Sequence, residues 1–377
     1  MDPPNLRKYG VPIYAAGWVP NRALKSLDDN ADREGGVQYY VVLAGGGGEG
    51  RSGIPNAVLT SSFDWQSNCL SPQPIGKLGF GSDLPYRMLV HPGGDGLLCA
   101  LPTRCRFYEW DNIIEDGSIK LSLKESEMLL PQLENIEQQL SLSFNNESSV
   151  LALGGEEGKL RVFNWPSMKV ILDEAEVHPS VKDLCFSLDG KFLVSLGRGS
   201  AKVWDIDSAK LVASLPKEDD EAFVSCRFSH AQDDTSVLYI AAIKGSFGCI
   251  QKWNAISWKK TRSTKIPCES VSSFDASPDG KLLAIGTAQG DVLILSANSV
   301  KVLSAIKRAH LGIVTTLAFS KDSRVLVSAS MDSSARVTAI DSLTRGGGKL
   351  SVWMIILVVL LAVAAYFIQR YEILKIS

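Results

Sequence analysis

Several features that mark common protein classes are missing from this sequence of 377 residues. The seven cysteines are dispersed and include no CxxC pair, which indicates reduced core thiols and argues against a disulfide framework or a zinc site. A formal net charge of -2 lacks the basic excess that nucleic-acid binding usually requires. With 45% hydrophobic and 21% charged residues, the composition is that of a globular protein and not of a disordered one.

The N-terminal residues, MDPPN, have no charged-then-apolar stretch typical of a signal peptide. The long apolar run lies instead at 350–368, where nineteen residues carry no charge and Trp353 and Tyr366 lie near the two ends. About 20 apolar residues suffice to cross a bilayer, and buried core helices are usually shorter. We therefore predict one transmembrane helix at 350–368, followed by a short luminal tail at 369–377.

The orientation of this span follows from the absence of an N-terminal signal. Arg345 and Lys349 precede the span and Arg370 and Lys375 follow it, so the flanking charges are balanced. No N-terminal signal would carry the residues before the span across the membrane, and free thiols suit the reducing cytosol. We expect residues 1–341 to face the cytosol, and the short span suits a thin bilayer such as that of the endoplasmic reticulum.

The soluble part contains a repeat of about forty residues. An apolar strand ends in a turn at each repeat, with spacings of 42, 42, 48 and 43 residues. The turns begin at Phe144-Asn145, Phe186-Ser187, Phe228-Ser229, Ala276-Ser277 and Phe319-Ser320. Asp189-Gly190 and Asp279-Gly280 are hairpin dipeptides, and Val203-Trp204-Asp205 matches the strand end of a WD repeat.

Four-stranded units with this period predict an all-β fold, a seven-bladed WD-repeat β-propeller. We expect the blades to begin near residues 39, 86, 138, 181, 223, 271 and 314. The last unit runs out of strands near Asp341, so we predict that the apolar segment 11–16 completes it and closes the ring. Residues 125–140 are interpreted as a connection between blades, and 342–349 as a flexible tether.

A glycine-rich loop, AGGGGEGRSGIPN at 44–56, separates predicted strands at 39–43 and 57–63. Its glycines satisfy GxGxxG and nearly satisfy a Walker A motif. Both motifs need a helix directly after the glycines, so that its amides can hold phosphate. Gly53 and Pro55 prevent that helix, and Glu49 would repel phosphate, so nucleotide binding by this loop is disfavoured.

Two interpretations of the loop remain open. It is either a flexible hairpin connection or a cation site, in which main-chain carbonyls and Glu49 surround a hard ion. A cation would stiffen the loop and present Ile54 and Asn56 outward to a partner.

The string AGGGGEG..GIPN, the seven WD-like blades and the single C-terminal anchor together resemble the endoplasmic-reticulum exchange factors that activate the small GTPase of the COPII coat. The short tail is similar to that of the plant members. The resemblance implies a guanine-nucleotide exchange factor that promotes GDP release without covalent chemistry, and so starts vesicle formation toward the Golgi. It also implies that Asn56 is the main exchange residue, with Ile54 and Pro55 shaping the contact. A potassium ion would sit among Gly48, Glu49, Gly50, Arg51, Ser52 and Gly53.

Two other functions are considered. A non-catalytic trafficking scaffold, which helps membrane cargo such as phosphate transporters leave the endoplasmic reticulum, shares the propeller and anchor. The intact GIPN sequence favours the exchange factor. A propeller hydrolase has little support, because His91, His178, His230 and His310 fall at blade junctions, where WD repeats place structural histidines.

Overall fold

The computed structural model describes residues 3–20, 23, 38–48, 52–115, 118–230 and 236–340. The chain divides into two compact units, Met1–Ala339 and Ile340–Ser377. The tether, transmembrane helix and tail predicted at 342–377 lie outside the described residues. Within the described ranges, no helix is long and apolar enough to cross a membrane.

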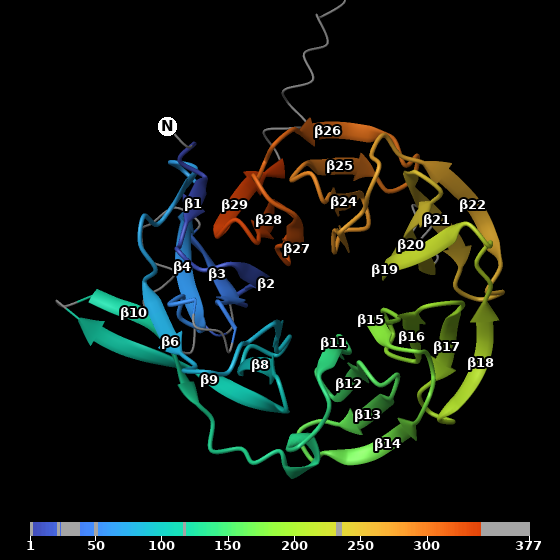
Figure 1. The fold of residues 1–377 in the computed structure, drawn as a ribbon, viewed down its shortest axis with the longest axis horizontal. Coiled ribbons are helices and arrows are strands. Elements are labelled where there is room, and N and C mark those ends of the chain that lie inside the picture. Colours follow the sequence, from blue (N-terminus) through green and yellow to red (C-terminus); the bar gives the residue numbers. More distant parts are fainter. Residues whose placement is uncertain are drawn as a thin grey trace, which may run out of the picture. The chain divides into compact units, whose positions relative to one another are not determined.

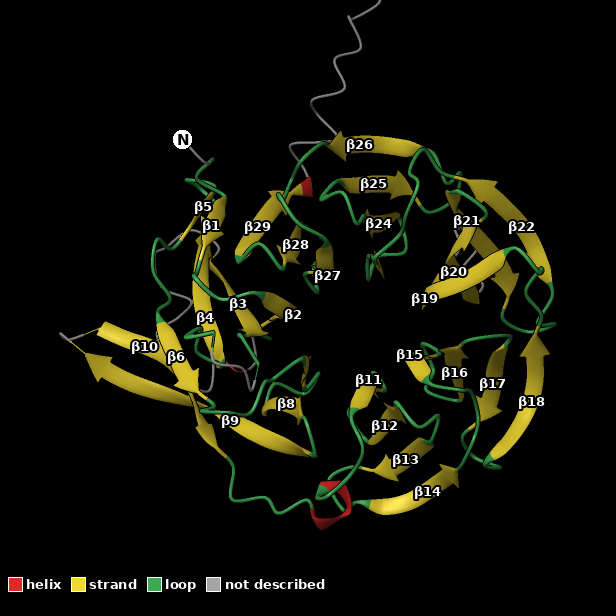
Figure 2. Ribbon diagram, viewed as in Figure 1, coloured by secondary structure: helices red, strands yellow, loops and turns green. Residues whose placement is uncertain are grey.

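The first unit is a ring of seven antiparallel β-sheets, which confirms the predicted seven-bladed propeller (Figure 1). Strands make up nearly all of the regular structure in the described part of the chain (Figure 2). Each blade has its first strand nearest the centre of the ring. The connection between the second and third blades contains only a short 3-10 turn, Pro131–Leu133, as expected for residues 125–140.

The first three blades contain the following strands. Blade one has β2 (Ile13–Trp18), β3 (Gln38–Gly45), β4 (Ala57–Asp64), β5 (Cys69–Leu70) and β6 (Gly76–Gly79), with β5 and β6 both paired to β4. Blade two has β7 (Arg87–Val90), β8 (Gly96–Leu101), β9 (Arg104–Glu115) and β10 (Ser118–Glu125). Blade three has β11 (Gln139–Phe144), β12 (Val150–Gly155), β13 (Leu160–Asn164) and β14 (Lys169–Glu174). The long hairpin of β9 and β10 projects beyond the ring (Figure 1).

The other four blades follow the same plan. Blade four has β15 (Val181–Phe186), β16 (Phe192–Gly197), β17 (Ala201–Asp205) and β18 (Lys210–Leu215). Blade five has β19 (Glu221–His230), β20 (Ser236–Lys244), β21 (Phe247–Asn254) and β22 (Lys260–Lys265). Blade six has β23 (Ser273–Ala276), β24 (Leu282–Gly286), β25 (Val292–Ser296) and β26 (Val302–Ile306). Blade seven has β27 (Val314–Phe319), β28 (Val325–Ser330), β29 (Ser334–Ala339) and β1 (Leu6–Lys8).

The ring is closed by the N-terminus, but the prediction that segment 11–16 forms the closing strand is wrong. β1 pairs with β29 and completes blade seven, whereas β2 is the innermost strand of blade one. Burial explains the difference. Ile13 and Ala15 are buried on an inner strand, while the polar sequence of β1 suits an outer edge that faces solvent. The first blade therefore begins near residue 13 and not near 39.

Burial decreases from the second strand of each blade to the fourth. β8, β12 and β28 are buried along their whole length, because the blades on either side cover both faces. The outer strands β14 and β18 are mostly exposed. Apolar side chains between neighbouring blades form the core, so the sheets pack face to face around the ring.

Two buried histidines, His178 and His310, form hydrogen bonds within their own blades, as the sequence predicts. His178 Nε2 lies 3.0 Å from Ser195 Oγ, which also accepts a hydrogen bond from Trp204. The ring nitrogens of His310 lie 2.6 Å from Ser334 Oγ and 2.8 Å from Ser328 Oγ. Burial lowers the pKa of each imidazole to about 4. Both histidines therefore link strands as neutral groups.

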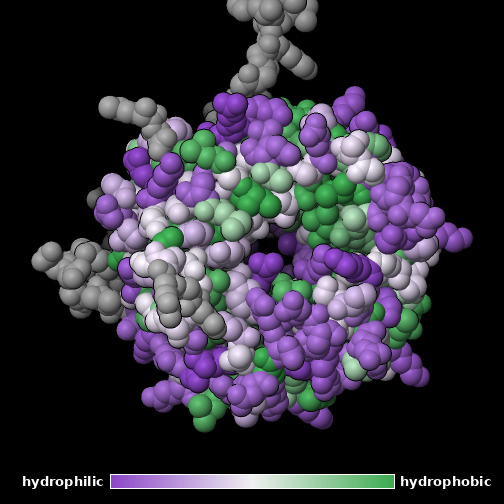
Figure 3. Space-filling model, in the orientation of Figure 1, coloured by the Kyte–Doolittle hydropathy of each residue, from purple (hydrophilic) through white to green (hydrophobic). Residues whose placement is uncertain are grey.

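The inner strands surround a narrow opening at the centre of the ring, with hydrophilic residues along part of its rim (Figure 3). Arg227 in β19 donates to Asp183 in β15 over 3.0 Å and to Asp275 in β23 over 3.1 Å. Burial opposes the charge of the guanidinium, but the two carboxylates outweigh it and raise the pKa of Arg227. One side chain thus joins the inner strands of three consecutive blades.

The glycine-rich loop as candidate functional site

The glycine-rich loop connects β3 and β4 of the first blade. The two strands pair from Gln38↔Asp64 to Gly45↔Ala57, and the loop begins immediately beyond the last pair. A strand follows the glycines where a phosphate-binding motif would have a helix. The structure therefore confirms the expectation that the glycine motifs lack the helix on which nucleotide phosphates bind.

Close backbone packing requires glycine at the start of the loop. A Cβ atom on Gly45 would lie 1.9 Å from the carbonyl oxygen of Pro12, and one on Gly46 would lie 2.2 Å from Asn56 Oδ1. Gly46 has φ +151° and donates a hydrogen bond of 3.0 Å to Pro12. These glycines allow the loop to leave the sheet directly against the segment that enters β2.

Asn56 lies beneath the loop, with only 3% of its surface exposed. Its Oδ1 accepts a hydrogen bond of 3.0 Å from the amide of Gly48, and its Nδ2 donates to the carbonyl of Gly48 over 3.1 Å. The same Nδ2 donates to the carbonyl of Gly81 over 3.0 Å. The prediction that Asn56 points outward is therefore wrong, because its carboxamide is used within the protein.

The tip of the loop is exposed. Ile54 exposes 37% of its surface, and Ser52, Gly53 and Pro55 are also exposed. The amide of Ile54 donates a hydrogen bond of 3.3 Å to Ser52 Oγ, and Gly53 has φ +72°, a conformation that favours glycine. The loop thus exposes the apolar side chain of Ile54 next to Pro55 at its tip, while Asn56 holds the part of the loop that adjoins the sheet.

The predicted cation ligands are only partly described, since Glu49, Gly50 and Arg51 lie outside the described residues. Of the remaining candidates, Gly48 directs its carbonyl toward Asn56 Nδ2, and the Ser52 hydroxyl accepts the amide of Ile54. In the part of the chain that the structure describes, no group of three or more His, Cys, Asp or Glu side chains forms a metal site.

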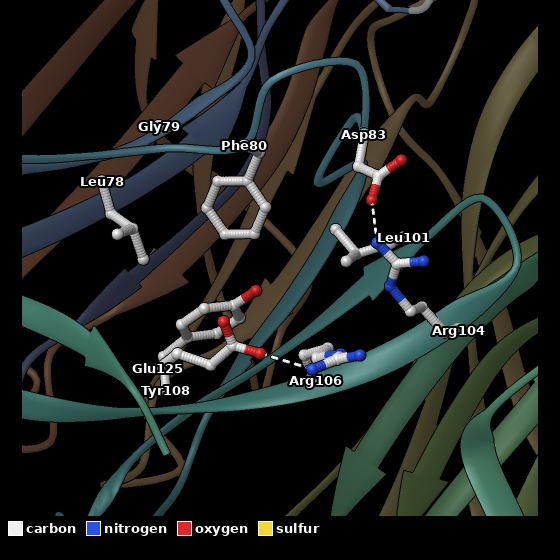
Figure 4. Close-up of a pocket in the computed structure, with 9 residues that line it drawn as sticks. All are labelled: Leu78, Gly79, Phe80, Asp83, Leu101, Arg104, Arg106, Tyr108 and Glu125. Atoms are coloured by element: carbon white, nitrogen blue, oxygen red, sulfur yellow. Dashed lines mark hydrogen bonds and ion pairs between the residues drawn. The ribbon is translucent and has the colours of Figure 1, made fainter. Parts of the chain in front are cut away.

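A pocket of about 350 Å³ lies beside the loop, between β6 and β9 (Figure 4). It is lined by Leu78, Gly79, Phe80, Asp83, Leu101, Arg104, Arg106, Tyr108 and Glu125. The pocket adjoins the loop because the amide of Phe80 donates a hydrogen bond of 2.9 Å to the carbonyl of Asn56. No sequence motif identified this pocket, since its residues come from two blades.

Charges in the pocket are already paired. Arg104 forms an ion pair with Asp83, and Arg106 pairs with Glu125 and, over 3.3 Å, with Glu134. The ring of Phe80 packs against that of Tyr108 with centroids 5.1 Å apart, and burial raises the pKa of the Tyr108 phenol. The Asp83–Arg104 and Phe80–Tyr108 contacts join the segment after β6 to blade two, and so fix the stretch that contains Gly81.

The fold and its repeats define a WD-repeat β-propeller with a glycine-rich loop on its first blade. Family models agree, since the WD domain, G-beta repeat, matches residues 300–338 and the anaphase-promoting complex subunit 4 WD40 domain matches 142–232.

The sequences of several known proteins are similar to most of this chain. SEC12-like protein 2 of Arabidopsis thaliana is 47% identical over 90% of this chain and 89% of its own length. SEC12-like protein 1 of the same plant is 32% identical over 74% of this chain and 70% of its own. The guanine nucleotide-exchange factor SEC12 of Mus musculus is 24% identical over 83% of this chain and 84% of its own. The chain belongs to the SEC12 family and is of the plant type.

Proposed function

We propose that this protein is a guanine-nucleotide exchange factor for the small GTPase of the COPII coat, acting at the endoplasmic reticulum membrane. The observation that carries the proposal is the loop itself, whose base is fixed by Asn56 and whose tip exposes Ile54 and Pro55. Relatives named as guanine nucleotide-exchange factors, such as that of Mus musculus, support an exchange role.

The mechanism needs no covalent step. Small GTPases hold GDP through a phosphate loop and magnesium, with switch segments closed over them. An ordered loop tip that binds the open, nucleotide-free form of the GTPase lowers the affinity of the GTPase for GDP. By linkage, GDP lowers the affinity of the GTPase for the loop by the same factor. In this scheme Ile54 and Pro55 touch the switch segments. GTP then enters the vacant site, and the activated GTPase starts coat assembly.

Two further parts of the proposal concern regions that lie wholly or partly outside the described residues. The uncharged run at 350–368 would anchor the propeller to the endoplasmic reticulum membrane, with the propeller in the cytosol. A potassium ion within residues 48–53 would supply a fixed positive charge that orders the loop carbonyls. Exchange activity should then be higher in potassium than in sodium.

The test is GDP release from the purified coat GTPase, followed by fluorescence, with the full chain in mild detergent. Wild-type protein should accelerate release. We expect Ile54→Ala to reduce this acceleration by at least about tenfold, because one buried apolar contact is worth roughly 1.5–3 kcal/mol. Leu303→Ala on the outer strand β26 is a matched control, since Leu303 is also exposed but lies far from the loop in sequence and on another blade.

The outcomes separate the two functions considered. Acceleration that is lost with Ile54→Ala and kept with Leu303→Ala supports the exchange factor. If folded wild-type protein leaves GDP release unchanged in both potassium and sodium, the exchange reading is wrong. The non-catalytic trafficking scaffold would then be the better account.

A further inference from the structure

The side chain of Asn56 is buried and fully hydrogen-bonded, which argues against a direct contact with a partner protein. It is buried at the end of the loop, immediately before β4, whereas Ile54 and Pro55 next to it are exposed. Both Nδ2 hydrogens are directed to carbonyls of Gly48 and Gly81, and Oδ1 accepts the amide of Gly48. The carboxamide therefore has no hydrogen left to donate to another protein.

The bonds of Asn56 connect three separate stretches of backbone. Gly48 lies at the start of the loop, Asn56 at its end, and Gly81 in the segment that follows β6. The main chain adds a bond of 2.9 Å from the amide of Phe80 to the carbonyl of Asn56. Phe80 is in turn packed against Tyr108 of blade two. The loop is thus tied to a segment held by a second blade.

The space around the carboxamide is equally restricted. A Cβ atom on Gly46 would lie 2.2 Å from Asn56 Oδ1 and 2.6 Å from its Cα atom. Any side chain at residue 46 would therefore displace Asn56 from its bonds. Glycine at position 46 is therefore needed for the Asn56 carboxamide to make its bonds.

We infer that Asn56 is a positioning residue, which fixes the glycine-rich loop against Gly81 so that Ile54 is held out for the partner, and that it does not touch the GTPase. The inference rests on the proposed function for the role of Ile54, but the role of Asn56 in ordering the loop is independent of it. The specific contact then belongs to Ile54 at the tip and the rigidity to Asn56 at the start of β4, which reverses the roles that the family resemblance implied.

Two measurements on the full chain in mild detergent test the inference. The first is hydrogen–deuterium exchange of the Gly48 amide, which Asn56 Oδ1 accepts. In Asn56→Ala we expect the amide to exchange roughly tenfold faster or more. Ile54→Ala should leave its rate unchanged. Asn146→Ala is a control, since the Asn146 side chain also donates to a carbonyl, that of Leu188, but between blades three and four.

The second measurement is a double-mutant cycle on GDP release. If Asn56 acts only through the loop, Asn56→Ala combined with Ile54→Ala should be about as slow as the slower single variant. If Asn56 contacts the GTPase, the two losses should multiply. Gly46→Ala gives a second route to the same state, because it displaces the carboxamide while keeping Asn56, and it should reproduce the loss of Gly48 protection.

Unchanged Gly48 protection in a folded Asn56→Ala protein would overturn the inference, as would multiplicative losses in the cycle. Should Asn56→Ala fail to fold by circular dichroism, Gly46→Ala decides the question in the same way. If wild-type protein proves inactive in exchange, the proposed function fails alone, and the deuterium measurement still decides whether Asn56 orders the loop.

Discussion

Asn5 and Val337 form a reciprocal pair of hydrogen bonds, with Asn5 Nδ2 donating to the carbonyl of Val337 over 2.8 Å and the amide of Val337 donating to the carbonyl of Asn5 over 3.0 Å. The two residues are 332 positions apart. Together with the β1–β29 pairs they join the N-terminus to the last blade and cover the edge of β29.

Deleting residues 1–8 should therefore destabilise the whole ring. It removes three strand pairs and both Asn5 bonds and exposes β29 as an edge, for an expected loss of about 3 kcal/mol and increased aggregation. Urea unfolding followed by circular dichroism measures the first effect and light scattering the second. Asn5→Ala, which removes one side-chain bond, should cost only about 1 kcal/mol. An unchanged midpoint for the deletion would show that β1 contributes nothing to closure.

Arg227 provides a second test of how blades are joined. Arg227→Met leaves Asp183 and Asp275 without their shared cation, and breaking a buried pair costs about 3–5 kcal/mol. Because the Arg227 side chain is 31% exposed, solvent should reduce the cost to about 2 kcal/mol. Lys307→Met is the control, since it breaks an exposed pair with Asp291 and should cost less than about 1 kcal/mol. Equal costs for the two variants would contradict this account.

Stability should depend on pH through His178 and His310. The pKa of each is lowered by burial from 6.5 to about 4 in the folded protein. The unfolded chain therefore binds protons first, and stability falls as pH decreases from about 6.5 toward 4. At pH 5 each histidine should cost about 2 kcal/mol relative to pH 7.5.

Urea unfolding of wild type and His310→Gln at both pH values measures this effect. The variant should lose about 2 kcal/mol less than wild type between pH 7.5 and 5, whatever its stability at pH 7.5. The same change in free energy for both proteins would show that His310 is not the titrating group.

Gly45→Ala should distort the junction between the loop and β2. The added Cβ would lie 1.9 Å from the backbone oxygen of Pro12, which cannot move aside without breaking the pair between β2 and β3. We expect a loss of about 2 kcal/mol in unfolding free energy. Gly79→Ala in the same blade is the matched control, because a Cβ there meets nothing within 4 Å. A Gly45→Ala protein as stable as the control would argue that the junction adapts.

Local patterns were sufficient for most of the propeller. The turns at Phe186-Ser187 and Phe319-Ser320 fall at the ends of β15 and β27, where the repeat predicted them. Trp204, which marks a strand end in the sequence, bonds with His178 through Ser195. Such signals involve residues within one blade, so a period of about forty residues carries them.

Segment 11–16 shows what local sequence patterns do not predict, which is the blade that a strand joins. Its apolar residues predicted a strand correctly, but hydrophobicity alone does not say which blade receives it, and the strand belongs to blade one and not to blade seven. The polar residues of β1 were too few to predict a strand at all. Only the pairing with β29 determines that they close the ring.

The sequence by itself determined the number of blades and the place of the glycine-rich loop between two strands, because alternating apolar residues and glycine turns act over a few positions. Only the tertiary structure decided that Asn56 turns inward and Ile54 outward. That choice depends on Gly81, 25 positions away, whose carbonyl accepts one hydrogen of the Asn56 amide. A buried amide must satisfy its hydrogen bonds, and its partners are known only once the blades are packed.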